Sequence, residues 1–443
     1  MDHASGFAAL AVVAACVIVW GLVSGRLERW DVSAPIAFVV LGLVVTHGPT
    51  ALVHFTLHSS TIRSLAEVTL AIVLFADASR VNLRALRSDA AIPGRLLGVA
   101  LPLTIAAGAA TAAVLFGSSG LWVAAAIGAI VAPTDAALGA SIMSDQRVPA
   151  GVRRTLNVES GLNDGIATPF VNFFIAGAVT ADALGGQHLW AAVGALLGGT
   201  LLGIGIGVVG GTLLALARRH RWSSPAFRPL AILALAVFAY SAAYVGGVNG
   251  FVCAFVAGLA FGSIDHHNDE AVLGFTEEAG TLMSLLVWFV FGAVMLVPGL
   301  EDTGWKDVLF ALLALTVLRM VPVAVALVGT GLDRVTVAFI GWFGPRGLAS
   351  VVFGLLAVDA FESSQSKAVL AAVTLTVALS VLLHGVSASP LAARYGAYAS
   401  ARFGAGHPAH GRAGGTAPLA TRRLRRVGSP GAHRDSATEP GSG

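Results

Sequence analysis

The sequence of 443 residues is 56% hydrophobic and only 12% charged, with a formal net charge of +3. A soluble globular domain carries roughly twice this charged fraction, so the composition excludes a soluble protein. Its two cysteines, Cys16 and Cys253, lie in separate apolar segments, so neither a disulfide framework nor a zinc site is expected.

Apolar stretches long enough to cross about 30 Å of hydrocarbon as a helix recur along the chain. They predict an all-α polytopic membrane protein with thirteen transmembrane segments. In chain order these cover residues 6–24, 33–47, 62–80, 93–116, 120–142, 157–180, 188–217, 228–244, 247–263, 275–297, 305–328, 335–358 and 367–395. The expected transmembrane domain is 1–396. Residues 397–443, rich in Gly, Pro, Ala and Arg, are expected to form a disordered cytoplasmic tail.

The positions of Lys and Arg predict the topology. Of the 27 basic residues, only Arg63, Lys306 and Lys367 follow even-numbered segments, and Arg319 and Arg346 lie inside segments. All others follow odd-numbered segments, and basic loops face the cytoplasm. We therefore expect an outside N-terminus and a cytoplasmic C-terminus. No basic residue precedes the first segment, which is expected to remain a membrane helix rather than serve as a signal peptide.

Five acidic residues fall inside the expected segments, namely Glu67, Asp77, Asp135, Glu159 and Asp164. A charge at the centre of a bilayer costs about 2.5–3.5 kcal/mol or more, so each needs a partner, a cavity or a function. Asp77 lies near the end of its segment, where an interfacial position and a functional one are equal alternatives.

Two of the expected segments are interrupted in the middle. In the fifth, Asp135 follows Pro133, which removes a backbone donor and disturbs the helix. In the twelfth, GPRG at 344–347 interrupts an apolar run and includes Arg346. Pairing segments 1–6 with 8–13 as two inverted six-helix repeats puts the fifth and twelfth in corresponding positions. Paired interruptions of this kind indicate the midplane site of a transporter.

The stretch VESGLNDGIATP concentrates polar residues in the sixth segment. Ser160 precedes Asp164 by four residues, and Glu159 precedes Asn163 by four, so the two pairs occupy adjoining faces of one helix. Hydroxyl, amide and carboxylate oxygens suit a small hard cation. We expect Asp164 to carry the proton and the cation, Asp135 to lie close by, and Asn163 to brace the unwound backbone.

These residue types predict an exchange mechanism. Carboxylates that share a confined cavity hold a proton more tightly than isolated ones. A cation needs the deprotonated carboxylate, so proton and cation compete for one site. If the protein changes facing only when the site is occupied, this competition produces antiport.

Glycines in the seventh segment invite two interpretations. GIGVVG at 205–210 matches a dinucleotide-binding pattern, but no strand precedes it and the match carries no weight. Gly199, Gly203, Gly207 and Gly211 repeat every four residues, which predicts close packing against another helix.

Several of these motifs resemble those of the monovalent cation:proton antiporter family, the sodium/proton exchangers of NhaP type. The resemblance covers about residues 5–395. It rests on APTDAALG (132–139), VESGLNDGIATP (158–169) and GPRGLAS (344–350), supported by LFADASR (74–80) and LLHGVSASPLA (382–392).

The resemblance implies a homodimer of thirteen-helix subunits, each with a dimerisation domain and a mobile core in which the broken fifth and twelfth segments cross near the ion site. It implies Na⁺ binding by Asp164, Asp135, Ser160 and the carbonyl group of Thr134. It also implies an ion pair between Glu159 and an arginine of segment 11, which here is Arg319. The Asn163–Asp164 form is associated with electroneutral exchange, and Asp77 and Arg346 are expected to be accessory residues.

The sequence therefore predicts a secondary-active antiporter, not an enzyme, that exchanges Na⁺ or Li⁺ for H⁺ by an elevator-type movement and serves pH homeostasis. A K⁺/H⁺ antiporter, a non-transporting membrane sensor on the same scaffold and a membrane enzyme are the alternatives. The Arg-rich, Lys-poor composition favours a bacterial inner membrane as the location. The expected partners are the cation, protons, lipid and a second copy of the chain, with no cofactor and no nucleic acid.

Overall fold

The computed structural model describes residues 3–27, 30, 32–47, 57, 59–81, 91–180, 187–264 and 270–403. These residues form helices joined by turns, and no strand occurs among them. Seven stretches of helix are long and apolar enough to cross a membrane, and four shorter apolar helices accompany them. The structure thus confirms the predicted all-helical, multi-pass membrane architecture.

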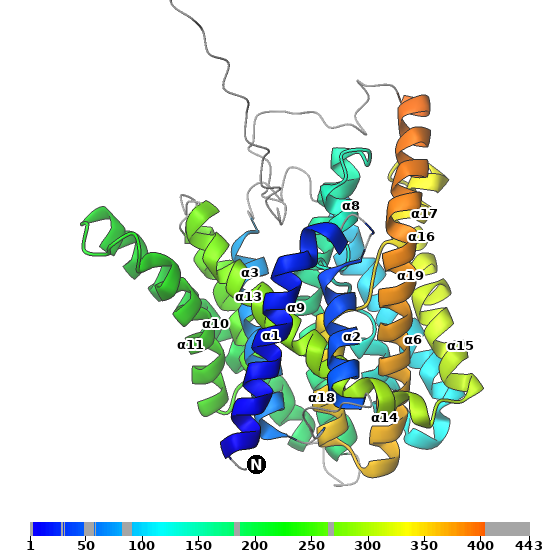
Figure 1. The fold of residues 1–443 in the computed structure, drawn as a ribbon, viewed down its shortest axis with the longest axis horizontal. Helices are drawn as coiled ribbons and strands as arrows, with labels where there is room; N and C mark the ends of the chain where they lie inside the picture. The colour runs from blue at the N-terminus through cyan, green and yellow to red at the C-terminus, as the bar shows by residue number, and fades with distance from the viewer. Residues whose placement is uncertain are drawn as a thin grey trace, which may run out of the picture.

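The helices form two groups that pack against each other (Figure 1). The group that we call the scaffold contains α1 (His3–Leu27), α2 (Ala34–His47), α3 (Ser60–Ser79), α10 (Gln187–Arg219), α11 (Arg228–Val245), α12 (Gly250–Ile264), α13 (Glu270–Val290), the π-helical turn η4 (Phe291–Met295) and α14 (Leu296–Glu301).

The second group, which we call the core, contains α5 (Ala91–Arg95), the π-helical turn η2 (Leu96–Ala100), α6 (Leu101–Leu115), the 3₁₀ turn η3 (Gly117–Ser119), α7 (Leu121–Ile130), α8 (Ala140–Ser144), α9 (Ala150–Thr180), α15 (Trp305–Leu315), α16 (Val317–Ala326), α17 (Arg334–Trp342), α18 (Leu348–Ala360) and α19 (Ser363–Phe403). Helix α9 contacts both groups, packing on α7 within the core and on α3, α10 and α12 of the scaffold. Helix α14 of the scaffold also packs on α19 of the core. The N-terminus and the C-terminal end of α19 lie at opposite ends of the bundle in Figure 1.

The glycine repeat of α10 packs against α12, as its spacing predicts. A Cβ atom at Gly199, Gly203 or Gly207 would lie 2.5, 2.6 or 2.4 Å from the carbonyl oxygens of residues 249, 253 and 257. Two helices can approach this closely only where one of them lacks side chains. The GIGVVG stretch lies inside the same helix, so it forms no phosphate-binding turn.

Three expected segments are interrupted in the middle by non-helical backbone. Residues 131–139 separate α7 from α8, and residues 343–347 separate α17 from α18, at the two interruptions that the sequence predicts. A third break, at Thr316 between α15 and α16, was not predicted, because no proline or glycine marks it. Thr316 has φ −115° and ψ −91°, and its hydroxyl donates to the carbonyl group of Leu312.

The C-terminal helix is longer than predicted. α19 continues to Phe403, beyond residue 396, where the change in composition placed the start of the tail. The rest of the expected tail, residues 404–443, lies outside the described residues.

Candidate functional site

The two predicted interruptions meet inside the core. The amide nitrogen of Asp135 donates to the carbonyl oxygen of Pro345 at 2.7 Å. Pro133 and Pro345 have no amide hydrogen to continue their helices, so each stretch leaves unpaired carbonyl groups in a region without bulk water.

Arg346 donates to carbonyl groups at two of the three breaks. Its Nη1 atom donates to the carbonyl oxygen of Ala132 at 2.6 Å, and its Nη2 atom donates to that of Ala314, just before the break at Thr316, at 3.1 Å. Ser350 Oγ donates to the carbonyl oxygen of Ile130 at 2.7 Å. Arg346 is only 1% exposed. The guanidinium group therefore stabilises the broken backbone from within, whereas the sequence offered only an unspecified accessory role.

The carboxylate of Asp135 lies at the N-terminal end of α18. Its Oδ2 atom accepts from the amide of Leu348 at 2.8 Å. Its Oδ1 atom accepts from the amides of Ala137 at 2.6 Å and Leu138 at 3.1 Å. The N-terminus of a helix favours a negative charge. Asp135 therefore joins the two interrupted segments through both its backbone and its side chain.

Glycines of the GPRG motif make room for charged neighbours. A Cβ atom at Gly347 would lie 2.0 Å from Asp135 Oδ2. A Cβ atom at Gly344 would lie 2.6 Å from Arg319 Nε. The close approach of these polar groups therefore explains why glycine stands at both positions.

The polar face of α9 contacts the first interruption. Asn163 Nδ2 donates to Thr134 Oγ1 at 2.5 Å, and Thr134 Oγ1 lies 3.2 Å from Ser160 Oγ. All three side chains are buried. The structure therefore attaches α9 to the unwound stretch through hydroxyl and amide groups, with Asn163 in contact with the broken backbone segment.

A small cavity lies between the core and the scaffold. Its lining residues are Val73, Asp77, Asp135, Ala136, Ala137, Ser160, Asp164, Ser284, Trp288 and Leu348. Its volume of about 20 Å³ is room for one water molecule or a bare monovalent cation. Asp135, Ser160 and Asp164, which the sequence singled out, share this cavity. Asp77, which is half-buried, joins them from α3.

Glu159 and Arg319 form an ion pair beside the cavity rather than in it. Arg319 Nη1 lies 2.5 Å from Glu159 Oε1, and both side chains are 2% exposed. The pair connects α9 to α16, immediately after the break at Thr316. Removing either partner of such a buried pair is strongly destabilising, because the other charge is left uncompensated.

A polar chain that was not predicted from the sequence lies behind the GPRG motif. The amide of Arg346 donates to Ser380 Oγ at 2.6 Å, and Ser380 Oγ lies 3.2 Å from His384 Nδ1. His384 Nε2 lies 2.9 Å from the carbonyl oxygen of Trp342, the last residue of α17. His384 Nδ1 also lies 2.9 Å from the carbonyl oxygen of Ser380, so the ring connects α19 to the end of α17. An ionisable residue inside an apolar segment was the available signal.

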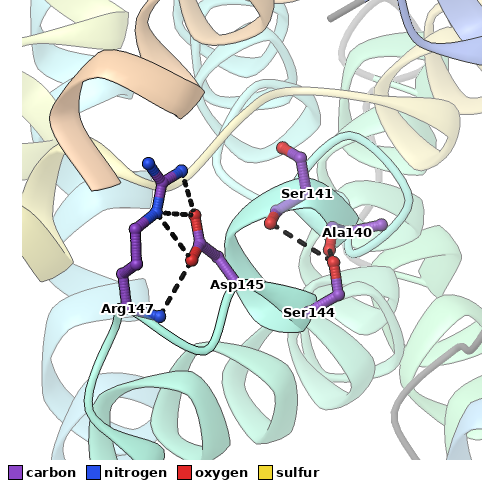
Figure 2. A network of polar contacts seen from close by, with 5 residues as sticks. All are labelled: Ala140, Ser141, Ser144, Asp145 and Arg147. Atoms are coloured by element: carbon purple, nitrogen blue, oxygen red, sulfur yellow. Dashed lines mark hydrogen bonds and ion pairs between the residues drawn. The ribbon is translucent and has the colours of Figure 1, made fainter. Parts of the chain in front are cut away.

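A charged loop fixes the start of α9 (Figure 2). Asp145, which follows α8, accepts from Arg147 Nη2 at 2.6 Å, from Arg147 Nε at 3.0 Å and from the Arg147 amide at 2.9 Å. Burial raises the pKa of Asp145, but the hydrogen bonds from Arg147 outweigh it and leave the pKa below its ordinary value. A Cβ atom at Gly396 of α19 would lie 2.6 Å from the carbonyl oxygen of Arg147, so glycine allows α19 to pack closely on this loop.

Interrupted membrane segments around a buried cavity of carboxylate and hydroxyl oxygens define a membrane protein of the ion-transporter class. The chain matches the transmembrane sodium/hydrogen exchanger family over residues 10–394, and it belongs to this family. The family and its relatives are ion exchangers rather than enzymes, in agreement with the prediction.

Individual relatives share part of the chain. It is 29% identical over 261 residues to Na(+)/H(+) antiporter 2 of Zygosaccharomyces rouxii, a match that covers 54% of this chain and 31% of the relative. It is 27% identical over 248 residues to a probable Na(+)/H(+) antiporter of Schizosaccharomyces pombe, covering 52% and 32%. The matches thus span about a third of the length of these relatives.

The fold is similar to that of a solved structure, the sodium proton antiporter MjNhaP1 from Methanocaldococcus jannaschii at pH 8. The TM-score is 0.70, and the match covers 87% of this chain and 97% of the other. At 18% identity, this likeness supports the fold.

Proposed function

We propose that the chain is a secondary-active antiporter that exchanges Na⁺ or Li⁺ for H⁺ across the plasma membrane. The observation that carries this proposal is the shared cavity, in which Asp77, Asp135 and Asp164 lie together with Ser160. Three carboxylates around a space for one water provide oxygen ligands for a single dehydrated cation. Asp164 among them takes up a proton in place of the cation, so cation and proton exclude one another.

The residues divide into ligands and supports. Asp164 is the carrier that alternates between proton and cation, with Asp135, Ser160 and the Thr134 carbonyl group completing the coordination. Asn163 holds Thr134 in place through its hydrogen bond to Thr134 Oγ1. Asp135 already accepts three amide hydrogen bonds, which hold its carboxylate in place as a fixed ligand.

The accessory residues take more specific roles. Asp77 attracts the cation from the scaffold side of the cavity. Arg346 stabilises the interrupted helices without contacting the ion, because its guanidinium group donates to backbone carbonyl groups. The Glu159–Arg319 pair keeps α9 and α16 together as the core moves.

The proposed architecture has thirteen membrane-crossing helices in two inverted six-helix repeats, with the interruptions between α7 and α8 and between α17 and α18 in corresponding positions. The core moves against the scaffold as an elevator, and two chains form a homodimer. An outside N-terminus and a cytoplasmic C-terminus agree with the opposite positions of the first and last described helix ends (Figure 1). Exchange is proposed to be electroneutral, one cation for one proton.

Transport in proteoliposomes tests the proposal. Wild-type protein and Asp164→Asn are reconstituted with an internal pH dye and given Na⁺, Li⁺ or K⁺ jumps at several pH values. The expected result is cation-driven proton movement for wild type with Na⁺ and Li⁺, and none for Asp164→Asn. Asp302→Asn is a matched control, since Asp302 is 66% exposed in a pair with Lys367.

Each other outcome has a distinct meaning. A response to K⁺ but not to Na⁺ or Li⁺ replaces the proposed ion with K⁺. Normal exchange by Asp164→Asn contradicts the role of Asp164. A folded wild-type protein that moves no protons with any of the three cations favours a non-transporting sensor.

A further inference from the structure

The wall of the cavity opposite α9 comes from two scaffold helices. Val73 and Asp77 of α3, and Ser284 and Trp288 of α13, line it. Each pair is spaced four residues apart, so its members lie on one helix face. Asp77 has a role in the proposed function, but Ser284 and Trp288 of α13 have none.

An ion pair fixes the register of these two helices. Arg80, at the end of α3, pairs with Glu277 near the start of α13, so the helices run antiparallel. At 1.5 Å per residue, Asp77 lies about 5 Å from the level of this pair, Ser284 about 10 Å and Trp288 about 17 Å. Going inward from the Arg80–Glu277 end, the scaffold wall therefore presents a carboxylate, then a hydroxyl group, then an indole.

The Ser284 hydroxyl group is suited to a cation. Its proton is donated to the carbonyl oxygen of Gly280 at 2.7 Å, so Oγ offers only lone pairs to anything else. The side chain is 7% exposed and lines the same cavity as Asp164. An acceptor-only oxygen among carboxylates provides another hard ligand and no donor for an anion.

Trp288 ends the path beyond Ser284. Its side chain is 1% exposed and packs edge-to-face on Phe291 with ring centroids 6.0 Å apart. Its indole offers no oxygen ligand to a cation. Among the four scaffold residues that line the cavity, Ser284 is therefore the last oxygen ligand counted from the Arg80–Glu277 end.

We propose that Ser284 is a cation-positioning residue of the exchange site, supplying an oxygen ligand from the scaffold opposite Asp164. This inference rests on the proposed exchange function. In the proposed elevator movement, α13 stays in the scaffold while Asp164 moves with the core. The Ser284 hydroxyl group therefore completes the site only in the conformation seen here. Ser284 thus sets the affinity for the cation at the membrane face on the Arg80–Glu277 side, which the topology predicts to be cytoplasmic.

The test compares Ser284→Ala and Ser284→Thr in proteoliposomes of sorted orientation, with KM for Na⁺ and Li⁺ measured at each face. Ser284→Ala is expected to raise KM at the Arg80–Glu277 face about tenfold, the effect of losing one ligand to a charged group. The maximal rate and the KM at the opposite face stay close to wild type, and Ser284→Thr retains most of the affinity.

Ser263→Ala is the matched control. Ser263 on α12 makes the same bond to the carbonyl oxygen four residues earlier, that of Leu259 at 2.7 Å, but it does not line the cavity. An unchanged KM at both faces in Ser284→Ala overturns the inference. A lower maximal rate with unchanged KM in both Ser284→Ala and Ser284→Thr also overturns the inference, because that pattern indicates disturbed helix packing and not a lost ligand. An inactive wild type instead contradicts the exchange function itself. Thermal unfolding in detergent identifies any variant that fails to fold. If Ser284→Ala does not fold, Ser284→Cys replaces it, because cysteine is similar in volume to serine but lacks the hard oxygen.

Discussion

The amide group of Asp135 donates to the carbonyl group of Pro345, which joins two chain segments more than two hundred residues apart in sequence. The side chain of Asp135 repeats the connection by accepting from the amide of Leu348. Each interruption satisfies only part of its backbone by itself, so the two broken stretches stabilise each other. The ion cavity lies directly beside this junction.

Gly347→Ala is expected to lower the rate of transport at least tenfold. The new Cβ atom would overlap Asp135 Oδ2, which lies 2.0 Å from its position, and would push the carboxylate out of the cavity. Dye-based proton flux in proteoliposomes measures the effect. Gly98→Ala is the control, because nothing lies within 4 Å of a Cβ atom there. Normal flux in Gly347→Ala would show that the position of Asp135 does not matter.

Reversing the charges of Glu159 and Arg319 tests the buried ion pair. Glu159→Arg and Arg319→Glu are each expected to lower the stability by about 3–5 kcal/mol, because a buried charge loses its partner. Glu159→Arg is expected to be the worse, since it leaves Arg319 and Arg346 without the nearby anion. The double exchange recovers part of the loss. The midpoint of thermal unfolding in detergent reports each change.

The exposed pair of Lys367 and Asp302 provides the comparison for this experiment. Their side chains are 71% and 66% exposed, and such pairs contribute little. Lys367→Gln should therefore leave the unfolding temperature unchanged. Wild-type stability in both single variants of the Glu159–Arg319 pair would contradict its structural role.

Two glycines of α10 give opposite expectations for the same substitution. Gly207→Ala places a Cβ atom 2.4 Å from the carbonyl oxygen of Ala257, so α10 and α12 must separate, at a cost of about 1–3 kcal/mol. Gly205→Ala meets nothing within 4 Å and is expected to be neutral or slightly stabilising. Thermal unfolding in detergent measures both. Equal stability of the two variants would contradict the close helix contact.

Asp333 gives the protein a pH-dependent helix cap. It precedes α17 and accepts from the amides of Val335 and Thr336 at 3.0 and 3.1 Å and from the Tyr398 hydroxyl group at 3.1 Å. Burial raises its pKa, but the hydrogen bonds from Thr336, Tyr398 and Val335 outweigh it and leave the pKa below its ordinary value. A lowered pKa means that the carboxylate stabilises the fold above the unfolded-state pKa of about 3.9, and that this stability is lost as the pH falls through the folded-state pKa.

Asp333→Ala is therefore expected to cost about 1 kcal/mol near neutral pH, the usual value of an N-cap. The difference from wild type stays constant down to about pH 4.5 and shrinks below it. Thermal unfolding in detergent between pH 8 and pH 3.5 follows the difference. Asp333→Asn, which keeps a capping oxygen, is the control. A difference that widens as the pH falls would contradict the assignment.

The sequence indicated the parts of the fold that depend on local chemistry. Pro133 and Pro345 interrupt their helices where predicted, because a missing amide hydrogen acts locally. Ser160 and Asp164 line one cavity because their spacing places them on one helix face. The glycine repeat of α10 packs closely for the same kind of reason.

Features that arise from tertiary contacts could not be derived in this way. The break at Thr316 has no local breaker residue, and Arg346 uses the carbonyl group of Ala314 beside it. The orientation of Asp77 towards the cavity depends on the packing of α3 against α9, where Gly161 lies close to it. Ser380 and His384 act on a motif that is distant in the sequence, which no periodicity reveals.

The buried guanidinium group of Arg346 also contributes to the net charge of the ionisable groups inside the core. Glu159 and Arg319 cancel each other, and Arg346 offsets one of the carboxylates of Asp135 and Asp164. An empty core with both carboxylates ionised therefore carries one excess negative charge on these groups, and a single Na⁺ ion or a single proton neutralises it. Moving an uncompensated charge through hydrocarbon is costly. In the proposed exchange, the core consequently crosses more readily when loaded than when empty, and Arg346 links occupancy to movement without touching the ion.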